Sequence, residues 1–362
     1  MTGLDLYLNQ IILGDCIEVL ESLPQGSIDL VFADPPYNLQ LQHELYRPNH
    51  TRVNGVDDPW DQFESFESYD KFTRLWLEAC RRVLKDSGTI WVIGSYHNIY
   101  RVGALLQDLG YWILNDVVWI KTNPMPNFKG VRLTNAQETL IWAQKQRGSR
   151  YTFNHHSMKA LNDDLQMRSD WLLPICNGKE RIKVNGSKAH ATQKPESLLY
   201  RVVLSSSSPG DVILDPFFGT GTTGAVAKKL QRQWIGIERD EFYVRIAQER
   251  IDAIPVAPFD PCVFGSEQSR RNKRIAFGRL LELGLLLPGQ PLYFEMKEDT
   301  SAIILADGHI RYQNIQGSIH QVGKHLLNSP CNGWEHWYYR ETGGGDLVVI
   351  DRLRDQVLEM LG

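Results

Sequence analysis

Short apolar runs alternate with stretches of helical periodicity over the first 250 residues of the chain. Six of these runs are almost continuous in apolar side chains, which is typical of strands covered on both faces, as in a parallel sheet. The predicted strands are Ile28–Ala33, Thr89–Ile93, Asp116–Ile120, Thr139–Trp142, Asp211–Leu214 and Trp234–Ile237. Apolar residues within Tyr69–Leu84 recur at spacings of three and four, which predicts an amphipathic helix. This alternation predicts an α/β fold, an open sheet with helices on both sides.

The pattern changes after Ile254. Three prolines and the basic run Arg270–Arg274 follow, so we place a linker at 255–274. The last part of the chain, 275–362, contains two strand-like pieces and a cluster of tryptophan and tyrosine residues between 334 and 339. We therefore predict a main domain at 1–254 and a small C-terminal α+β accessory domain at 275–362.

Composition narrows the class of protein. The chain has 362 residues, of which 42 % are hydrophobic and 23 % charged, as in soluble globular proteins. Its net charge of −4 argues against a surface that is basic throughout, but it is compatible with local basic surfaces. The five cysteines form no C-x-x-C pair, which predicts reduced thiols in a cytosol and no zinc or redox motif. Because the sequence has no run of 18 apolar residues, we expect no membrane span.

The first candidate site is Asp34-Pro35-Pro36-Tyr37, directly after the predicted strand 28–33. In an open α/β sheet, the ligand site lies at the carboxyl ends of the strands. The two prolines make the loop rigid and remove two backbone donors, which leaves the Asp34 carboxylate and the Pro35 carbonyl as fixed acceptors. Tyr37 adds a flat aromatic face. This combination suits a planar heterocycle that carries an exocyclic amine, and the alternative is an ordinary proline-rich turn.

The second candidate site is the glycine-rich segment Asp215–Gly224, which follows the predicted strand 211–214. Its three glycines satisfy the pattern G-x-G-x-x-G, and Glu238 stands 19 residues after Gly219 at the end of the next strand. An acidic side chain there can accept hydrogen bonds from ribose hydroxyls, which predicts a nucleoside-containing cofactor. The pattern alone does not separate NAD from other adenosyl ligands, and a glycine-rich turn without a ligand is the alternative.

Together, the two motifs resemble the paired signature of the S-adenosylmethionine-dependent DNA amino-methyltransferases. Their order, with the catalytic motif first, is that of the β group of this family. The similarity extends to Ile12–Asp15, to 115–128 and to Ala189–Pro195, where Ala191 replaces the proline that is usual in the family. It covers essentially the whole chain and is close to the cell-cycle-regulated (CcrM) and HinfI-type adenine enzymes.

The resemblance implies a Rossmann-like methyltransferase sheet with a circularly permuted motif order and a target-recognition region at about 145–190. It implies S-adenosylmethionine as the cofactor, without a metal. The implied reaction transfers a methyl group to N6 of a flipped adenine in double-stranded DNA, within the sequence GANTC. The relatives also imply a homodimer in a bacterial cytoplasm, associated with the nucleoid.

The resemblance also assigns expected roles to individual residues. The predicted catalytic residues are Asp34, Pro35, Pro36 and Tyr37. The predicted cofactor-binding residues are Asp15, Cys16, Asp34, Thr192, Lys194, Asp215, Phe217, Phe218, Gly219, Thr220, Gly221, Thr222, Glu238 and Arg239. The predicted DNA-binding residues are Lys121, Asn123 and Trp334, together with Arg270, Arg271, Lys273 and Arg274, which are included because the basic run can neutralise phosphates.

Alternatives remain open at this point. The basic residues of 265–279 can neutralise phosphates or form a solvated linker, and a second basic segment spans 179–194. Trp334 and Trp337 could stack on bases or form the core of a small domain. An aspartate at the start of the catalytic motif favours adenine, but an N4-cytosine methyltransferase is the alternative within the family. A NAD-dependent dehydrogenase or a non-catalytic DNA-binding regulator would leave the motif at Asp34 without a role.

Overall fold

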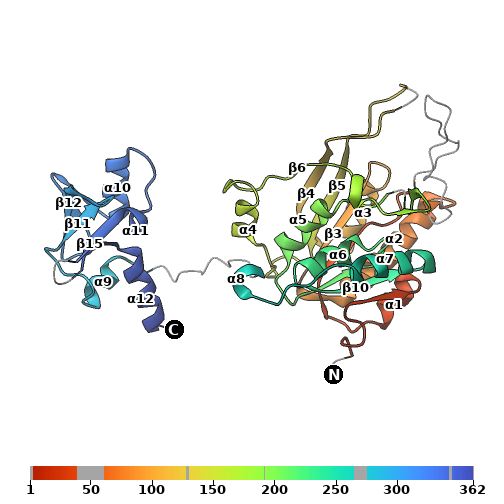
Figure 1. Ribbon diagram of the computed structural model, residues 1–362, viewed down its shortest axis with the longest axis horizontal. Coiled ribbons are helices and arrows are strands. Elements are labelled where there is room, and N and C mark those ends of the chain that lie inside the picture. Colours follow the sequence, from red (N-terminus) through yellow and green to blue (C-terminus); the bar gives the residue numbers. More distant parts are fainter. Residues whose placement is uncertain are drawn as a thin grey trace. The chain divides into compact units, whose positions relative to one another are not determined.

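The structure is a computed structural model that describes residues 3–38, 61–127, 130–190, 192–264, 275–341 and 345–361. The chain divides into two compact units, Met1–Gln268 and Ser269–Gly362, which are described separately (Figure 1). The predicted linker at 255–274 includes the point of division, and its residues 265–274 lie outside the described part of the chain.

The described residues of the first unit form a mixed eight-stranded sheet. In spatial order its strands are β1 (Gln10–Leu13), β10 (Gln233–Glu238), β9 (Val212–Asp215), β2 (Ile28–Ala33), β3 (Leu84–Gly94), β5 (Gln137–Gln144), β4 (Trp112–Lys121) and β6 (Asp170–Leu173). All six predicted strands are found, with ends that differ by a few residues. The expectation of a parallel sheet is wrong at β5, which runs antiparallel to both β3 and β4. A parallel return from β4 would need a crossover, usually a helix, and the described residues between β4 and β5 contain no helix.

Helices cover both faces of this sheet (Figure 1). One face packs against α1 (Cys16–Ser22), α2 (Phe66–Val83) and α3 (Ile99–Asp108), and the other against α4 (His155–Ala160), α5 (Glu196–Ser206), α6 (Thr222–Lys229) and α7 (Glu241–Asp252). Helix α2 begins before the predicted Tyr69 because the Ser65 hydroxyl accepts a hydrogen bond from the backbone N–H of Ser68 and caps the first turn. Leu84 was predicted to be the last residue of the helix, but it is the first residue of β3.

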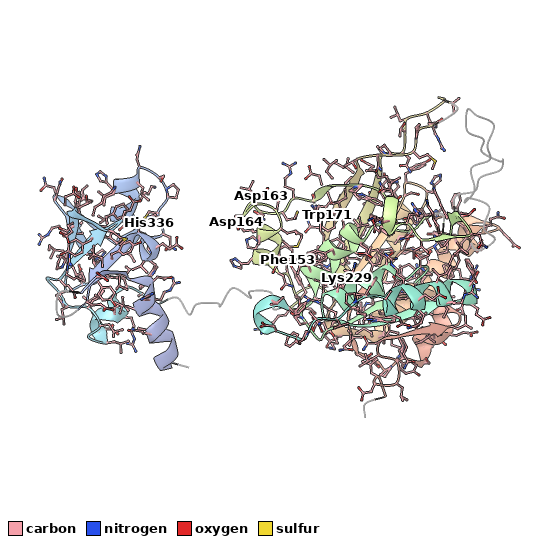
Figure 2. All side chains as sticks on the ribbon, viewed as in Figure 1. Phe153, Asp163, Asp164, Trp171, Lys229 and His336 are labelled. Atoms are coloured by element: carbon pink, nitrogen blue, oxygen red, sulfur yellow. The ribbon has the colours of Figure 1, made fainter. Side chains whose placement is uncertain are left out.

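Aromatic side chains fill much of the core on the second of these faces. Trp91 of β3 stacks on Trp142 of β5 with ring centres 5.2 Å apart. Trp171 of β6 packs on Trp91, and Phe153, just before α4, packs on Trp142. Figure 2 labels Trp171 and Phe153 among the side chains of the first unit. The unit also contains the short hairpin β7 (Lys183–Val184) and β8 (Ser187–Lys188), the 3-10 turn Gly178–Glu180 and α8 (Pro261–Phe264).

The order of the strands creates the place for a ligand. β2 and β9 are parallel neighbours, with Leu30 beside Ile213. After β2 the chain continues to α2 on one face of the sheet, whereas after β9 it continues to α6 on the other face. Loops that leave neighbouring strands toward opposite faces open a crevice at the carboxyl ends, where open α/β sheets bind their ligands. The loops that begin with Asp34 and with Asp215 meet at this crevice.

The second unit has the α+β arrangement that the sequence predicted. Its described residues form an antiparallel six-stranded sheet. The spatial order is β14 (Ile315–Gly317), β13 (Ile310–Tyr312), β12 (Lys297–Ile304), β11 (Pro291–Phe294), β15 (Trp337–Arg340) and β16 (Leu347–Val349). Its helices are α9 (Gly278–Glu282), α10 (Ile319–Leu327), α11 (Gly333–His336) and α12 (Asp351–Leu361). A core of its own, which includes Trp334 and Trp337, supports this unit.

Candidate active site

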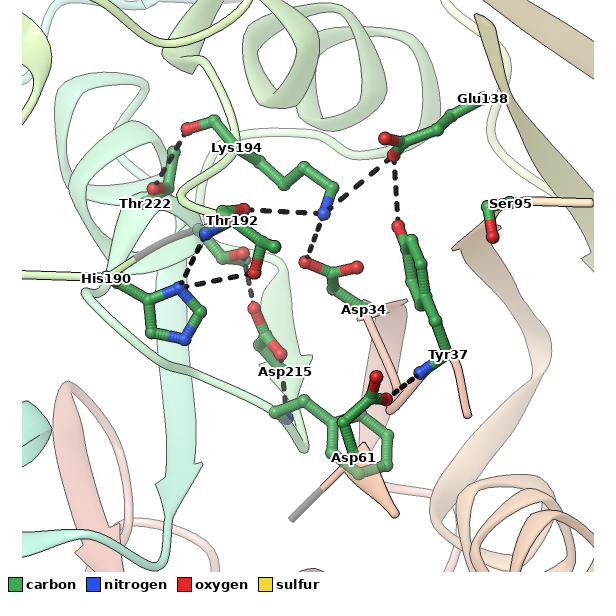
Figure 3. Close-up of polar contacts among 12 residues, drawn as sticks. Asp34, Tyr37, Asp61, Ser95, Glu138, His190, Thr192, Lys194, Asp215 and Thr222 are labelled. Atoms are coloured by element: carbon green, nitrogen blue, oxygen red, sulfur yellow. Dashed lines mark hydrogen bonds and ion pairs between the residues drawn. The ribbon is translucent and has the colours of Figure 1, made fainter. Parts of the chain in front are cut away.

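A cavity of about 610 Å³ lies at the carboxyl ends of β2, β9 and β10, within the usual size range of small-molecule sites. Its wall contains all four predicted catalytic residues. It also contains every predicted cofactor residue except Gly221. The two motifs, which are far apart in the sequence, therefore face one common space (Figure 3).

Buried polar contacts hold the loop after β2. The carboxylate of Asp61 accepts hydrogen bonds from the backbone N–H of Tyr37 at 2.5 Å and from the next N–H at 2.8 Å. The hydroxyl of Tyr69, on α2, donates to the carbonyl of Pro36 at 3.1 Å. The Pro36 carbonyl already has a protein donor, so the carbonyl of Pro35 is the better candidate acceptor for a ligand in this loop.

Two carboxylates and two lysines form a buried network at the same end of the cavity. Lys194 Nζ lies 2.7 Å from Asp34 Oδ2 and 3.9 Å from Glu138 Oε2 (Figure 3). Lys121 Nζ lies 2.7 Å from the other oxygen of Glu138. The hydroxyl of Tyr37 donates to Glu138 Oε2 at 3.0 Å. Each charge therefore has a partner of opposite sign, as buried charges require.

Burial and pairing shift the pKa values in this network. Burial raises the pKa of Asp34 above its usual range, against the attraction of Lys194. For Glu138, the attraction of Lys194 and Lys121 outweighs burial and lowers the pKa. Burial alone would lower the pKa of Lys194, but the two carboxylates raise it, so this ammonium stays charged.

The carboxylates at the other end of the cavity are held by neutral donors. Asp215 accepts from the backbone N–H of Phe217 at 2.9 Å and from the hydroxyl of Thr223 at 2.5 Å. Glu238 accepts from the backbone N–H of Gly219 at 2.8 Å. Burial raises the pKa of Asp215 to about 7 and also raises that of Glu238. These carboxylates order the glycine-rich loop and favour a cation beside them.

The three glycines of the G-x-G-x-x-G pattern do different work. Gly219 lines the cavity with a φ of +51°, a conformation that side chains rarely adopt. Gly221 is not part of the cavity wall, and a Cβ there would lie 2.8 Å from the Cβ of Ala247 on α7, so this glycine is needed for helix packing, and its predicted cofactor contact stays a prediction. A Cβ on Gly224 would lie 2.6 Å from the ring of Phe218, so this glycine also serves packing.

The structure changes the set of predicted DNA-binding residues. Lys121 is paired with Glu138 and its side chain is 11 % exposed, so its ammonium faces the active site and not a phosphate. The side-chain oxygen of Asn123 accepts a hydrogen bond from the backbone N–H of Ile175, so only part of this amide is left to bind DNA. Trp334 is 5 % exposed in the core of the second unit, which leaves no ring face for stacking on a base. The remaining members, Arg270, Arg271, Lys273 and Arg274, lie outside the described residues.

Several residues of the site were missed from the sequence. Glu138 was missed because a parallel β5 would begin at the opposite edge of the sheet, whereas the antiparallel strand begins at the edge where Tyr37 lies, and Glu138 accepts the hydroxyl of Tyr37. Asp61 and Tyr69 contact the loop across long sequence separations, and no local pattern marks such contacts. His190 lies in the segment Ala189–Pro195, which the family resemblance included, but it was not assigned a role. Burial and, to a smaller extent, the charge of Lys194 lower the pKa of His190 to about 4, so its ring is neutral.

In the described part of the chain, no group of three or more His, Cys, Asp or Glu side chains is arranged to hold a metal ion. No helix in the same residues is both long enough and apolar enough to cross a membrane.

Comparison with known proteins adds independent evidence. A family model described as DNA methylase (N6_N4_Mtase) matches residues 28–249. A second, described as Restriction Enzyme Adenine Methylase Associated, matches residues 264–361. Type II methyltransferase M.HinfI of Haemophilus influenzae is 49 % identical over 350 residues, which cover 96 % of each chain. Type II methyltransferase M2.DpnII of Streptococcus pneumoniae is 42 % identical over 241 residues, which cover 66 % of this chain and 88 % of the relative.

Solved structures show the same fold. The PvuII DNA methyltransferase (cytosine-N4-specific) has a TM-score of 0.53 at 21 % identity, covering 70 % of this chain and 89 % of that one. The M1.HpyAVI-SAM complex has a TM-score of 0.50 at 24 % identity, covering 67 % of this chain and 98 % of that one. With a family model matched over more than half of its length and a relative that is 49 % identical from end to end, the chain belongs to the DNA methylase family.

Proposed function

We propose that this protein transfers a methyl group from S-adenosylmethionine to N6 of an adenine that is flipped out of double-stranded DNA. The observation that carries the proposal is the shared cavity, in which Asp34 and Tyr37 face the glycine-rich loop after β9. The identity to a Type II methyltransferase over the whole chain supports the same reaction class.

The residues at the glycine-rich end fit S-adenosylmethionine. Once bound, it supplies a methyl group whose carbon–sulfur bond breaks with the electron pair left on sulfur. In the described residues, Asp215 and Glu238 form no ion pair, which suits a ligand that carries positive charge. Each oxygen of Glu238 accepts one backbone N–H and keeps a further lone pair for a ribose hydroxyl.

The loop after β2 fits the amine of a planar base. An adenine inside a duplex cannot reach this cavity, so the base must be flipped out of the stack. Tyr37 would stack on its ring, while the Asp34 carboxylate and the Pro35 carbonyl would accept its two N–H bonds. Acceptors placed in this way aim the nitrogen lone pair at the methyl group. The nitrogen gains the methyl group and loses one proton, which Asp34 can accept and pass to solvent.

Adenine is proposed over cytosine because the catalytic motif begins with aspartate and because residues 264–361 match the family model described as Restriction Enzyme Adenine Methylase Associated. The likeness to a cytosine-N4-specific enzyme supports the fold only. We extend the proposal to the site GANTC, to a homodimer and to a bacterial cytoplasmic, nucleoid-associated location, all of which rest on the family resemblance.

The second unit is proposed to bind DNA together with the basic segment before it. Residues 264–361 match the model described as Restriction Enzyme Adenine Methylase Associated, and 265–279 contain five basic residues against one acidic residue. Such a segment can neutralise phosphates. Deleting 265–362 should abolish the gel shift of specific DNA while calorimetry still detects cofactor binding. An undiminished gel shift would contradict this part of the proposal.

The direct test of the site is the Asp34→Ala variant. We expect methyl transfer, measured with a tritiated methyl group, to fall by at least about a hundredfold, because the acceptor for the amine is lost. The cofactor affinity measured by calorimetry should change by less than about threefold, because the proposed partners of the cofactor are the glycine-rich loop and Glu238. Wild-type turnover in this variant would refute the assignment.

A further inference from the structure

Lys194 lies at the loop that carries Asp34, although the sequence placed it with the cofactor residues. Its ammonium is 2.7 Å from Asp34 Oδ2 and 5.1 Å from the ring centre of Tyr37. Its side chain is 8 % exposed, and its backbone carbonyl accepts from the hydroxyl of Thr222 at the start of α6. The glycine-rich loop thus anchors the backbone of this lysine, while the ammonium contacts both side chains proposed to bind the base (Figure 3).

The two oxygens of Asp34 differ in their surroundings. Oδ2 accepts the hydrogen bond from Lys194, whereas Oδ1 is buried and has no hydrogen-bond partner among the described residues. A buried acceptor without a donor is costly, so the site is complete only when a donor arrives. Oδ1 is the oxygen left for the amine of the target base.

Glu138 completes the support on the other side of Lys194. It accepts the hydroxyl of Tyr37 at 3.0 Å, pairs with Lys121 at 2.7 Å and lies 3.9 Å from Lys194. With Asp34 included, two acids and two lysines balance in a space where an unpaired charge would be costly. A neutral base can enter this balanced network without leaving a charge uncompensated.

We infer that Lys194 is a positioning residue for the target base and not a cofactor ligand: it holds Oδ2 of Asp34 so that Oδ1 faces the amine, with Glu138 fixing the ammonium and Tyr37. This inference rests on the proposed function. It goes further by giving two roles to the segment 190–194: its backbone contacts the glycine-rich loop of the cofactor site, and the side chain of Lys194 contacts Asp34 and Tyr37 of the base site.

The inference predicts opposite pH effects for the two neighbours of Asp34. Ionised Asp34 is the stronger acceptor for the amine and the only form that can take its proton, so activity falls on the acid side as Asp34 is protonated. Removing the positive charge of Lys194 raises the pKa of Asp34 and moves this acid limb to higher pH. Removing the negative charge of Glu138 lowers the pKa of Asp34 and moves the limb to lower pH. The charged or titratable groups that face this pair are Tyr37, Lys121, Glu138, Arg181, His190 and Asp215.

The experiment measures single-turnover methyl transfer to DNA against pH for the full-length wild type and for Lys194→Met, Lys194→Arg and Glu138→Gln. The matched control is Lys145→Met, a lysine of similar exposure that is bonded to the Leu84 carbonyl and Asp86 at the other end of β5. Calorimetry with S-adenosylmethionine and thermal unfolding accompany each variant. A variant with native unfolding and native cofactor affinity is folded around its cofactor site.

We expect the acid limb to move up by at least about one pH unit in Lys194→Met and down in Glu138→Gln, with cofactor affinity within about threefold of the wild type. Lys194→Arg and Lys145→Met should leave the limb in place. The inference would be overturned if the acid limb of the pH profile did not move in Lys194→Met, or if this variant lost cofactor affinity by tenfold. In either case, methyl transfer by the wild type would still uphold the proposed function. Absence of methyl transfer by the wild type would overturn both.

Discussion

At the end of the cavity after β2, the carboxylates of Asp34 and Glu138 each have a lysine beside them, whereas at the end after β9 and β10 the carboxylates of Asp215 and Glu238 are bonded to backbone N–H groups and a hydroxyl. Lysine attraction lowers the pKa of Glu138, but burial raises the pKa of Asp215 to about 7. The network of Asp34, Glu138, Lys121 and Lys194 is balanced in charge and suits a neutral base. The other end retains uncompensated acidity and suits a cationic cofactor, so the charges at the two ends match the two partners of the proposed reaction.

The largest effect is expected at the balanced end. Tyr37→Ala removes the ring proposed to stack on the base, and stacking is worth about 1–3 kcal/mol per base. We expect kcat/KM for DNA to fall about ten- to a hundredfold or more, with cofactor affinity unchanged in calorimetry. Tyr37→Phe, which loses only the hydroxyl bonded to Glu138, is the control and should lose less. Equal losses in the two variants would place the importance of Tyr37 in its hydroxyl and not in its ring.

A packing change beneath the glycine-rich loop should disturb the other end. In Gly236→Ala, the new Cβ would lie 2.5 Å from the ring of Phe218, so we expect a loss of about 1–3 kcal/mol in the free energy of unfolding. Gly3→Ala, whose Cβ would lie 3.8 Å from Pro24, is the control with little expected change. Denaturant unfolding measures both variants. Equal stability of Gly236→Ala and wild type would show that the ring of Phe218 does not pack tightly against β10 at Gly236.

A smaller effect is expected from the acid that orders Gly219. Glu238→Gln keeps an acceptor but loses the charge and one of its backbone hydrogen bonds. Cofactor affinity should fall by about tenfold, since a hydrogen bond to a charged group contributes about 1.5–3 kcal/mol. The methyl-transfer rate at saturating cofactor should stay within a few-fold of wild type. If Glu238→Gln kept the native affinity for the cofactor but lost the methyl-transfer rate, the proposed role of Glu238 in binding the cofactor would be wrong.

The smallest effect concerns pH. The pKa of Asp215 is about 7, and a cation bound nearby favours its ionised form, so cofactor binding should release a proton. The affinity for S-adenosylmethionine should therefore rise as pH increases from about 6 to 8. The rise should be smaller for S-adenosylhomocysteine, which lacks the sulfonium charge. Parallel pH profiles for the two ligands in calorimetry would count against an uncompensated Asp215.

Much of the fold could be predicted because apolar runs reveal strands whatever their direction. The strand 28–33 and the loops at Asp34 and Asp215 followed from local sequence, and the rule for carboxyl ends brought the two loops together. Strand direction is not a local property. The reversed β5 therefore concealed Glu138, and with it the reason why Lys121 faces the active site and not DNA.

Side-chain roles were harder to predict than positions. The pattern G-x-G-x-x-G does not tell which glycine faces a ligand, and only the packing of α6 on α7 shows that Gly221 serves the helices. Likewise, a tryptophan that could stack on a base and one that fills a core look alike in sequence. The burial of Trp334 in the second unit decides between these alternatives.

The most direct test of the central claim is the identity of the modified base. Duplex DNA that contains GANTC should be incubated with the full-length protein and S-adenosylmethionine, digested to nucleosides and analysed by mass spectrometry. We expect N6-methyladenine in the DNA treated with the wild type and none in the DNA treated with the Asp34→Ala variant. N4-methylcytosine, or no methylated base, in the DNA treated with the wild type would contradict the proposed function.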